Sequence, residues 1–161
     1  MSIKLQKTLL VVDLQNEFLN EQTKPIFTIV QSLVDTYEHI IAMAFINKKN
    51  SRWAKDLNWI KCQKEDYSAK IAFTGYNTTI FRTRYGLENK DIQKLKNTSV
   101  DVLGLETDQC VLATCYGLWD EEIDFRLLSY GCASLGGAEA HDNAIKNMKR
   151  AFGENRIIEK Q

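Results

Sequence analysis

Short apolar runs alternate along this chain with longer segments whose apolar residues recur at helical spacing. Residues 8–13 form the first run, which is rich in leucine and valine, ends on a carboxylate and predicts a buried strand. Pro25 then suits the first turn of a helix, and apolar residues follow it every three or four positions up to Tyr37. The pattern therefore opens with a strand and a helix.

The same alternation continues to the end of the sequence. A second apolar run and four further strands are predicted at residues 40–46, 78–84, 100–105, 124–129 and 156–158. Helices are predicted at residues 88–96, 107–122 and 138–152, whereas residues 50–77 show no clear period. Alternating strands and helices indicate βαβ units with right-handed crossovers. They predict an α/β fold: a three-layer α/β/α sandwich around a mostly parallel, Rossmann-like, six-stranded sheet.

Polar residues gather where the predicted strands end. Open parallel sheets bind ligands beyond the carboxyl ends of their strands. Asp13 follows the first strand, Arg82 lies near the end of the third, and Cys110 comes shortly after the fourth. We therefore expect a carboxylate, a guanidinium group and a thiol to share one crevice.

Composition limits the classes of partner. The chain has 161 residues, the size of one domain, which we expect to span residues 1–161. Lys plus Arg and Asp plus Glu number 21 each, so the net charge is zero and no overall field attracts nucleic acid or an anionic membrane. The partner we expect is a small-molecule substrate, with neither nucleic acid nor membrane bound.

Location and cofactors are also constrained. No apolar run is long enough to cross a bilayer or to act as a signal peptide, and the four cysteines lack CxxC spacing. We therefore expect free thiols in a cytoplasmic protein. The sequence has neither GxGxxG nor GxxxxGK[ST], and its only histidines, His39 and His141, lie in predicted helices without an HExxH pattern. We accordingly expect no cofactor and no metal.

Cys110 stands where a predicted helix begins. The N–H groups at such a position favour a thiolate, which would lower the pKa of the thiol, and could also hold an oxyanion. Thr107 or Asp108 suits the helix cap. The alternative is that Cys110 is one more small buried residue, as we expect of the other three cysteines, Cys62, Cys115 and Cys132.

Asp13 and Arg82 are unusual at the ends of apolar strands. A carboxylate is costly there unless it caps, pairs or reacts, so Asp13 is either a backbone cap or a functional group. An inward-pointing Arg82 would pair with that carboxylate, while the alternative is an exposed charge at the strand end. Residues alone leave both alternatives open.

Three segments resemble one family. LLVVDLQNEF at residues 9–18 is similar to an opening strand with a D-x-Q-x-x-F motif. GLETDQCVLAT at residues 104–114 is similar to the nucleophile motif G-x-x-T-D-x-C-V-x-x-T, and YGCAS at residues 130–134 fits a C-terminal pattern. On these motifs the chain resembles the isochorismatase-like (cysteine hydrolase) family.

The resemblance implies a mechanism and its residues. Cys110 would attack an amide or imide carbonyl to form a thioester, with Asp13 as general base and acid. The backbone N–H groups of Glu106 and Cys110 would hold the oxyanion, and a non-proline cis peptide bond would precede Glu106. Phe18, Trp53 and Tyr85 would line the substrate pocket. The resemblance also implies a homodimer or a larger homo-oligomer.

This sequence departs from the family pattern at two places. Arg82 stands where the family has a catalytic lysine; it keeps the positive charge but is larger and is never deprotonated. Residues 47–53 contain no histidine, whereas the nicotinamidase branch carries a D-x-H-x-x-H metal site there, so we expect a non-nicotinamidase member. Cys110 argues against the vinyl-ether chemistry of isochorismatase itself.

Two hypotheses of function follow. The first is a cysteine hydrolase that cleaves a small C–N compound, an amide or imide, with Asp13, Arg82 and Cys110 as its catalytic residues. The second is a catalytically impaired relative that binds a small molecule or a protein partner, because arginine replaces lysine. A redox or thiol-transfer role of Cys110 is a third alternative.

Overall fold

A single parallel sheet organises the chain, and the structure, a computed structural model, describes residues 6–161. The strand order is β3-β2-β1-β4-β5-β6, and every neighbouring pair is parallel. The strands are β1 (Gln6–Val12), β2 (His39–Phe45), β3 (Thr78–Arg82), β4 (Thr98–Leu105), β5 (Phe125–Ala133) and β6 (Ile157–Ile158). The predicted six-stranded α/β sheet is therefore confirmed.

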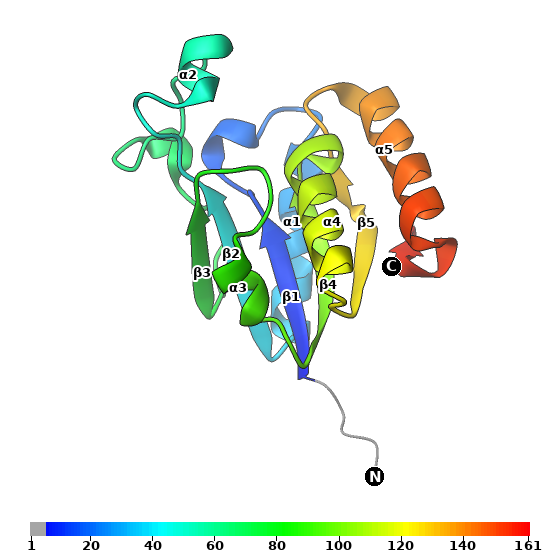
Figure 1. Cartoon of the computed structure of the whole chain (residues 1–161). Coiled ribbons are helices and arrows are strands. Elements are labelled where there is room, and N and C mark those ends of the chain that lie inside the picture. Colours follow the sequence, from blue (N-terminus) through cyan, green and yellow to red (C-terminus); the bar gives the residue numbers. More distant parts are fainter. Residues whose placement is uncertain (1–5) are drawn as a thin grey trace.

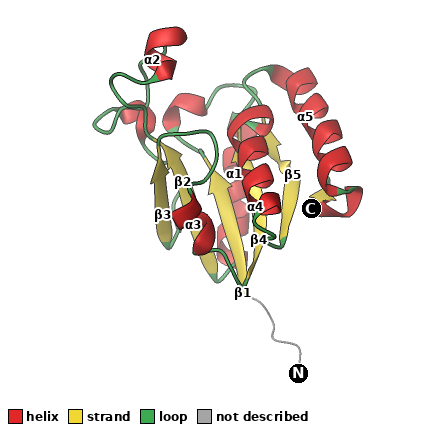
Figure 2. Ribbon diagram, viewed as in Figure 1, coloured by secondary structure: helices red, strands yellow, loops and turns green. Residues whose placement is uncertain are grey.

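Helices cover both faces of this sheet (Figures 1 and 2). They are α1 (Lys24–Leu33), α2 (Arg52–Asp56), α3 (Asn89–Gln93), α4 (Leu112–Asp120) and α5 (Gly137–Phe152). Helix α1 lies on one face and α3 and α4 on the other, while α5 packs against β5 and α4. None of the helices within residues 6–161 is both long enough and apolar enough to traverse a bilayer.

The core sits along the two central strands. Residues 9–12 of β1 and residues 102–105 of β4, apart from Gly104, are apolar and completely shielded from solvent. Strands covered on both faces need such continuous apolar runs, which is why the sequence pattern located them. Helix α1 buries Ile26, Val30 and Leu33 on the face that meets the sheet.

Some expectations need correction. His39 begins strand β2 instead of lying in a helix, because the buried run that follows it is a parallel strand. The predicted helix at residues 107–122 starts as a π-helical turn, Thr107–Val111, and continues as α4. The fifth strand reaches Ala133, four residues beyond the predicted end, since it stays paired with β4 up to that residue.

Gly104 permits the close approach of β1 and β4 near the carboxyl ends of the two strands. Its φ angle is +125°, and a Cβ atom built on it would lie 2.1 Å from the carbonyl oxygen of Val12. The pairing of β4 with β5 also shifts register between Val102 and Gly104. Glycine is therefore required where the two central strands deliver Asp13 and Glu106 to the same edge.

Gln15 anchors residues 50–77, the segment in which the sequence shows no periodic pattern of apolar residues. This buried side chain donates hydrogen bonds to the carbonyl oxygens of Phe45, at 2.9 Å, and Ala69, at 2.8 Å, and accepts one from the Phe45 N–H, at 2.8 Å. The main chain at Gln15 also forms an isolated antiparallel bridge with that of Ile71. One amide thus ties the end of β2 to the loop that returns from α2.

Candidate active site at the carboxyl edge of the sheet

Asp13 and Arg82 form a buried, two-point ion pair. Asp13 follows β1 with a φ of +49°, and its N–H donates to the carbonyl oxygen of Met43 at 3.0 Å. Arg82 ends β3 and donates from Nη1 to Oδ1 and from Nη2 to Oδ2 of Asp13, both at 2.8 Å. Both residues are 1 % exposed. The inward-pointing alternative for Arg82 is the one that the structure shows, and Arg84 is exposed instead.

Arg82 has a further contact that links the pair to the pocket wall. Its Nη2 also donates to the carbonyl oxygen of Tyr85, at 2.9 Å. Tyr85 in turn packs its ring against Trp53, with centroids 5.2 Å apart. Arg82 therefore orients the Asp13 carboxylate and fixes the loop that carries Tyr85 at the same time.

Cys110 lies on the π-helical turn after β4, which is fastened at several points. The Val111 N–H donates to the carbonyl oxygen of Glu106 at 3.1 Å, and the Thr114 hydroxyl donates to that of Cys110 at 2.7 Å. The Thr107 hydroxyl also hydrogen-bonds to Nδ1 of His141 on α5, at 2.7 Å. The Leu105–Glu106 peptide bond is cis, as the resemblance implies. His141 thus fastens the turn that carries the thiol.

The electrostatics of Cys110 differ from the sequence expectation. Burial and the adjacent Asp13 carboxylate raise the pKa of the thiol well above its ordinary value, and Arg82 opposes this effect only in part. Burial likewise raises the pKa of Asp13, while Arg82 works in the opposite direction. Desolvation and a neighbouring anion both favour the neutral thiol of Cys110 over the thiolate.

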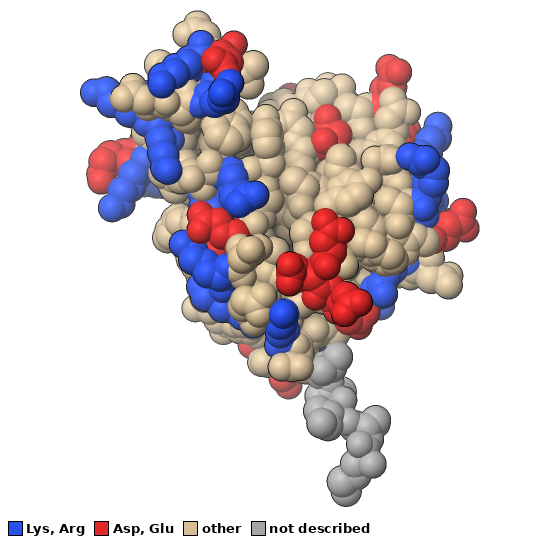
Figure 3. Space-filling model, viewed as in Figure 1, with Lys and Arg blue, Asp and Glu red and all other residues tan. Residues whose placement is uncertain are grey.

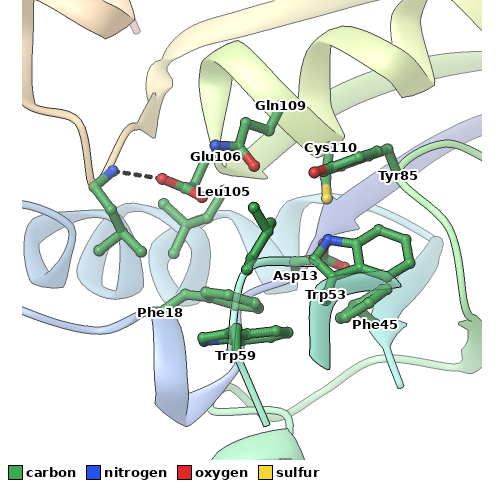
Figure 4. A pocket seen from close by; sticks show the side chains of 12 residues that line it. Asp13, Phe18, Phe45, Trp53, Trp59, Tyr85, Leu105, Glu106, Gln109 and Cys110 are labelled. Carbon is green, nitrogen blue, oxygen red and sulfur yellow. Dashed lines mark hydrogen bonds between the residues drawn. The ribbon is translucent and has the colours of Figure 1, made fainter. Parts of the chain in front are cut away.

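These groups open into an aromatic cavity of about 340 Å³ (Figure 4). That volume lies at the small end of the range usual for ligand pockets, about 300–1,000 Å³. The residues that line the cavity are Asp13, Phe18, Phe45, Trp53, Leu57, Trp59, Tyr85, Leu105, Glu106, Gln109, Cys110 and Leu135. Figure 4 shows the thiol of Cys110 pointing down toward Asp13, with the aromatic rings below and beside it.

The cavity joins most of the residues singled out in the sequence. Asp13, Cys110, Phe18, Trp53 and Tyr85 all line it, and Arg82 lies directly behind Asp13. Sequence reasoning missed Phe45 and Trp59 as wall residues and gave no role to the carboxylate of Glu106 or to Gln15. The D-x-Q-x-x-F motif contained Gln15, and this was the one signal that could have found it.

Asn47 fixes the segment that follows β2. It donates from Nδ2 to the carbonyl oxygen of Trp59 at 2.9 Å and from its main-chain N–H to that of Cys62 at 2.9 Å. Within residues 6–161, no three His, Cys, Asp or Glu side chains are grouped so that they could hold a metal ion.

Comparison with solved structures shows the same fold. The pyrazinamidase of Pyrococcus horikoshii in complex with zinc matches with a TM-score of 0.82 at 18% identity, covering 97% of this chain and 99% of that one. A cysteine hydrolase from Pseudomonas syringae matches with a TM-score of 0.81 at 16% identity, covering 98% of this chain and 93% of that one. The nicotinamidase of Bacillus subtilis matches with a TM-score of 0.79 at 17% identity, covering 96% of this chain and 100% of that one. A comparison with curated proteins finds no match.

The all-parallel α/β sheet of this chain is the fold that these solved structures share. The family model described as the isochorismatase domain matches residues 7–156. The chain therefore belongs to the isochorismatase family, a family of hydrolases. Its assignment to a branch other than the nicotinamidases stays a prediction.

Proposed function

We propose that this protein hydrolyses a small amide or imide through a thioester on Cys110. The observation that carries the proposal is the meeting of the Cys110 thiol and the Asp13 carboxylate inside one aromatic cavity, with Asp13 held by Arg82. The nicotinamidase and pyrazinamidase folds to which this chain is similar carry names of amide-cleaving enzymes, which supports a C–N substrate.

The first half of the reaction forms the thioester. Asp13 accepts the thiol proton as Sγ of Cys110 attacks the carbonyl carbon, because the raised pKa of the thiol makes a free thiolate scarce. The oxygen of the tetrahedral adduct is stabilised by the backbone N–H groups of Glu106 and Cys110 at the start of the helix. Asp13 returns the proton to the leaving nitrogen, the C–N bond breaks, and ammonia or an amine departs from an amide substrate, whereas an imide releases an amide group.

The second half restores the enzyme. A water molecule attacks the thioester carbon while Asp13 takes its proton, and the same N–H groups hold the second oxyanion. Collapse of this adduct breaks the C–S bond, the proton passes from Asp13 to Sγ, and a carboxylic acid leaves. Arg82 stays protonated throughout, so it acts by holding Asp13 in place and by its charge.

One observation favours the alternative, a family member that binds its ligand without turnover. Arg82 occupies both carboxylate oxygens of Asp13, which makes Asp13 a weaker base than a carboxylate held at one point. A carboxylate offers about four lone-pair positions, however, and Arg82 uses two of them. Positions therefore remain on Asp13 for the thiol proton, and the hydrolase is the function we propose.

The proposal is tested by measuring the release of hydrolysis products from a panel of small amides and imides: ammonia or an amine from the amides, and an amide from the imides. The wild-type protein is compared with Cys110→Ala, Asp13→Asn and Cys115→Ala, the last being a buried cysteine outside the cavity. Release by the wild type and Cys115→Ala, but not by the other two, is the expected result. Equal release by Cys110→Ala would overturn the proposal. No release across the panel would favour the binding alternative.

We also propose a cytoplasmic location, which is supported by four cysteines that are all free, including the buried neighbours Cys115 and Cys132.

A further inference from the structure

The charge of the cavity wall is unbalanced. Asp13 and Glu106 are the acidic residues that line it, and no Lys or Arg of residues 6–161 does so. Asp13 is neutralised by its ion pair with the buried Arg82. Glu106 is therefore the one lining residue whose formal charge has no partner in the described chain.

Glu106 presents a free oxygen. Its Oε1 accepts a hydrogen bond from the Leu135 N–H at 2.9 Å, whereas Oε2 has no hydrogen bond or ion pair among the described residues. Burial raises the pKa of Glu106, and the nearby carboxylates of Asp108 and Asp13 add to this effect. A half-buried carboxylate in this state is stabilised when a cation arrives beside it.

The opposite walls of the cavity are aromatic. Phe18 and Trp59 stack with ring centroids 6.0 Å apart, and Trp53 packs against Phe45 with centroids 4.8 Å apart. The faces of such rings carry negative partial charge and attract cations that lie within about 6 Å of their centroids. Figure 4 shows the carboxylate of Glu106 and the thiol of Cys110 on different sides of the space above these rings.

We propose that the cavity selects a cationic substrate: a small amide whose acyl part carries an ammonium group, quaternary or protonated, a few bonds from the scissile carbonyl. The Glu106 carboxylate balances the charge, and the rings of Phe18, Trp53 and Trp59 enclose it. This inference rests on the proposed function for its chemistry, but its binding step can be tested without turnover. Glu106 thus becomes a specificity-determining residue through its side chain, while its N–H serves the oxyanion.

A basic surface outside the cavity gives the rival expectation. Residues 46–70 contain seven Lys or Arg and three Asp or Glu, and basic side chains gather over α2 and the neighbouring loops (Figure 3). These side chains would attract an anionic substrate towards the opening of the cavity. They are solvated, however, and salt screens them over about 8 Å, whereas Glu106 lines the cavity in which the substrate binds. The charge inside the cavity therefore decides which ligand binds.

The binding test uses three probes of matched shape. Calorimetry follows the titration of each probe into the wild-type protein. The probes are choline, its neutral isostere with a quaternary carbon in place of the nitrogen, and the anion of tert-butylacetic acid. Choline is expected to bind most tightly. Equal binding of choline and its isostere, or tighter binding of the anion, would overturn the inference.

Glu106→Gln is the matched variant, because its amide oxygen still accepts the Leu135 hydrogen bond and only the charge is lost. The preference for choline over its isostere is expected to fall about tenfold, which corresponds to about 1.4 kcal/mol. Trp59→Leu removes one aromatic side chain and no charge. It is expected to weaken the binding of choline more than the binding of the isostere. An unchanged preference in both variants would contradict the inference.

A turnover test separates this inference from the proposed function. Betaine amide has a positively charged quaternary nitrogen where tert-butylacetamide has a neutral quaternary carbon, and the two are otherwise alike. For the wild-type protein, kcat/KM is expected to be higher for betaine amide. Hydrolysis of both at equal rates would overturn the inference and leave the proposed function standing. Selective choline binding without hydrolysis of either amide would instead favour the binding alternative.

Discussion

Arg82 grips both oxygens of the Asp13 carboxylate, with two hydrogen bonds of 2.8 Å, and neither side chain is appreciably exposed to solvent. The pair joins β3 to β1 across the intervening strand β2. A lysine can offer only a compact point charge at such a place, whereas the guanidinium group fixes the plane of the carboxylate. The arginine in this family member is thus accommodated as a two-point clamp.

Removal of Arg82 is predicted to destabilise the protein strongly. Arg82→Ala leaves the Asp13 carboxylate buried without a counterion, and we expect the free energy of unfolding to fall by about 3–5 kcal/mol. Arg82→Lys keeps the charge but loses one of the paired hydrogen bonds, for a loss of about 1–2 kcal/mol. Urea unfolding measures both. A loss below about 1 kcal/mol for Arg82→Ala, as for an exposed pair, would contradict the clamp.

The titration of Cys110 provides a second prediction, and its sign follows from the charges around the thiol. Burial and Asp13 raise the pKa of Cys110, so the wild-type thiol should ionise above its ordinary value of 9.0. Asp13→Asn removes the anion and keeps Arg82, and it should lower this pKa. The ultraviolet absorbance of the thiolate, with Cys110→Ala as the blank, follows both titrations. A lower pKa in the wild type than in Asp13→Asn would refute this description.

Gln15 is predicted to hold the loop that carries Trp59. Gln15→Ala leaves main-chain groups of Phe45 and Ala69 buried without partners, and should lower the free energy of unfolding by at least about 2 kcal/mol. Hydrogen exchange around residues 60–71 should accelerate. Gln31 is the matched control, since it makes two exposed contacts with Thr74, and Gln31→Ala should cost less than about 0.5 kcal/mol. Similar losses for both variants would argue against the anchor.

Gly104 is predicted to be irreplaceable for steric reasons. Gly104→Ala places its Cβ 2.1 Å from the Val12 carbonyl oxygen, and should cost more than about 3 kcal/mol of stability or prevent folding. Gly153 also has a positive φ, +89°, but no atom lies within 4 Å of its added Cβ. Gly153→Ala should therefore cost only the backbone strain of about 1–2 kcal/mol. Thermal unfolding of the two variants compares them, and equal effects would exclude a role for the close contact.

The strands of the sheet could be predicted because each is marked locally by its apolar run. Parallel strands that are covered on both faces are rich in apolar residues, and residues 9–12 of β1 and 102–105 of β4 form such runs. The convergence of Asp13, Arg82 and Cys110 followed from the rule on strand ends, and the motifs sharpened it. The end of β5 was placed too early because its last residues are held by pairing with β4, which no local pattern shows.

The cavity wall could be predicted only in part. Trp59 lies in a segment without periodicity that is fixed by the distant amide of Gln15, and Phe45 reads in the sequence as an ordinary strand residue. The pKa of Cys110 was expected to be low because the helix start is visible in the sequence, whereas burial beside Asp13 is not. Long-range contacts and desolvation are therefore what sequence reasoning lacked.

The thioester on Cys110 is the central claim, and intact-mass analysis tests it most directly. The wild-type protein, Cys110→Ala and Cys115→Ala are exposed to small amides, imides and activated esters and then quenched in acid. We predict an added acyl mass on the wild type and Cys115→Ala, and none on Cys110→Ala. An adduct that persists in Cys110→Ala, or amine release by the wild type without any Cys110-dependent adduct under single-turnover conditions, would contradict the account.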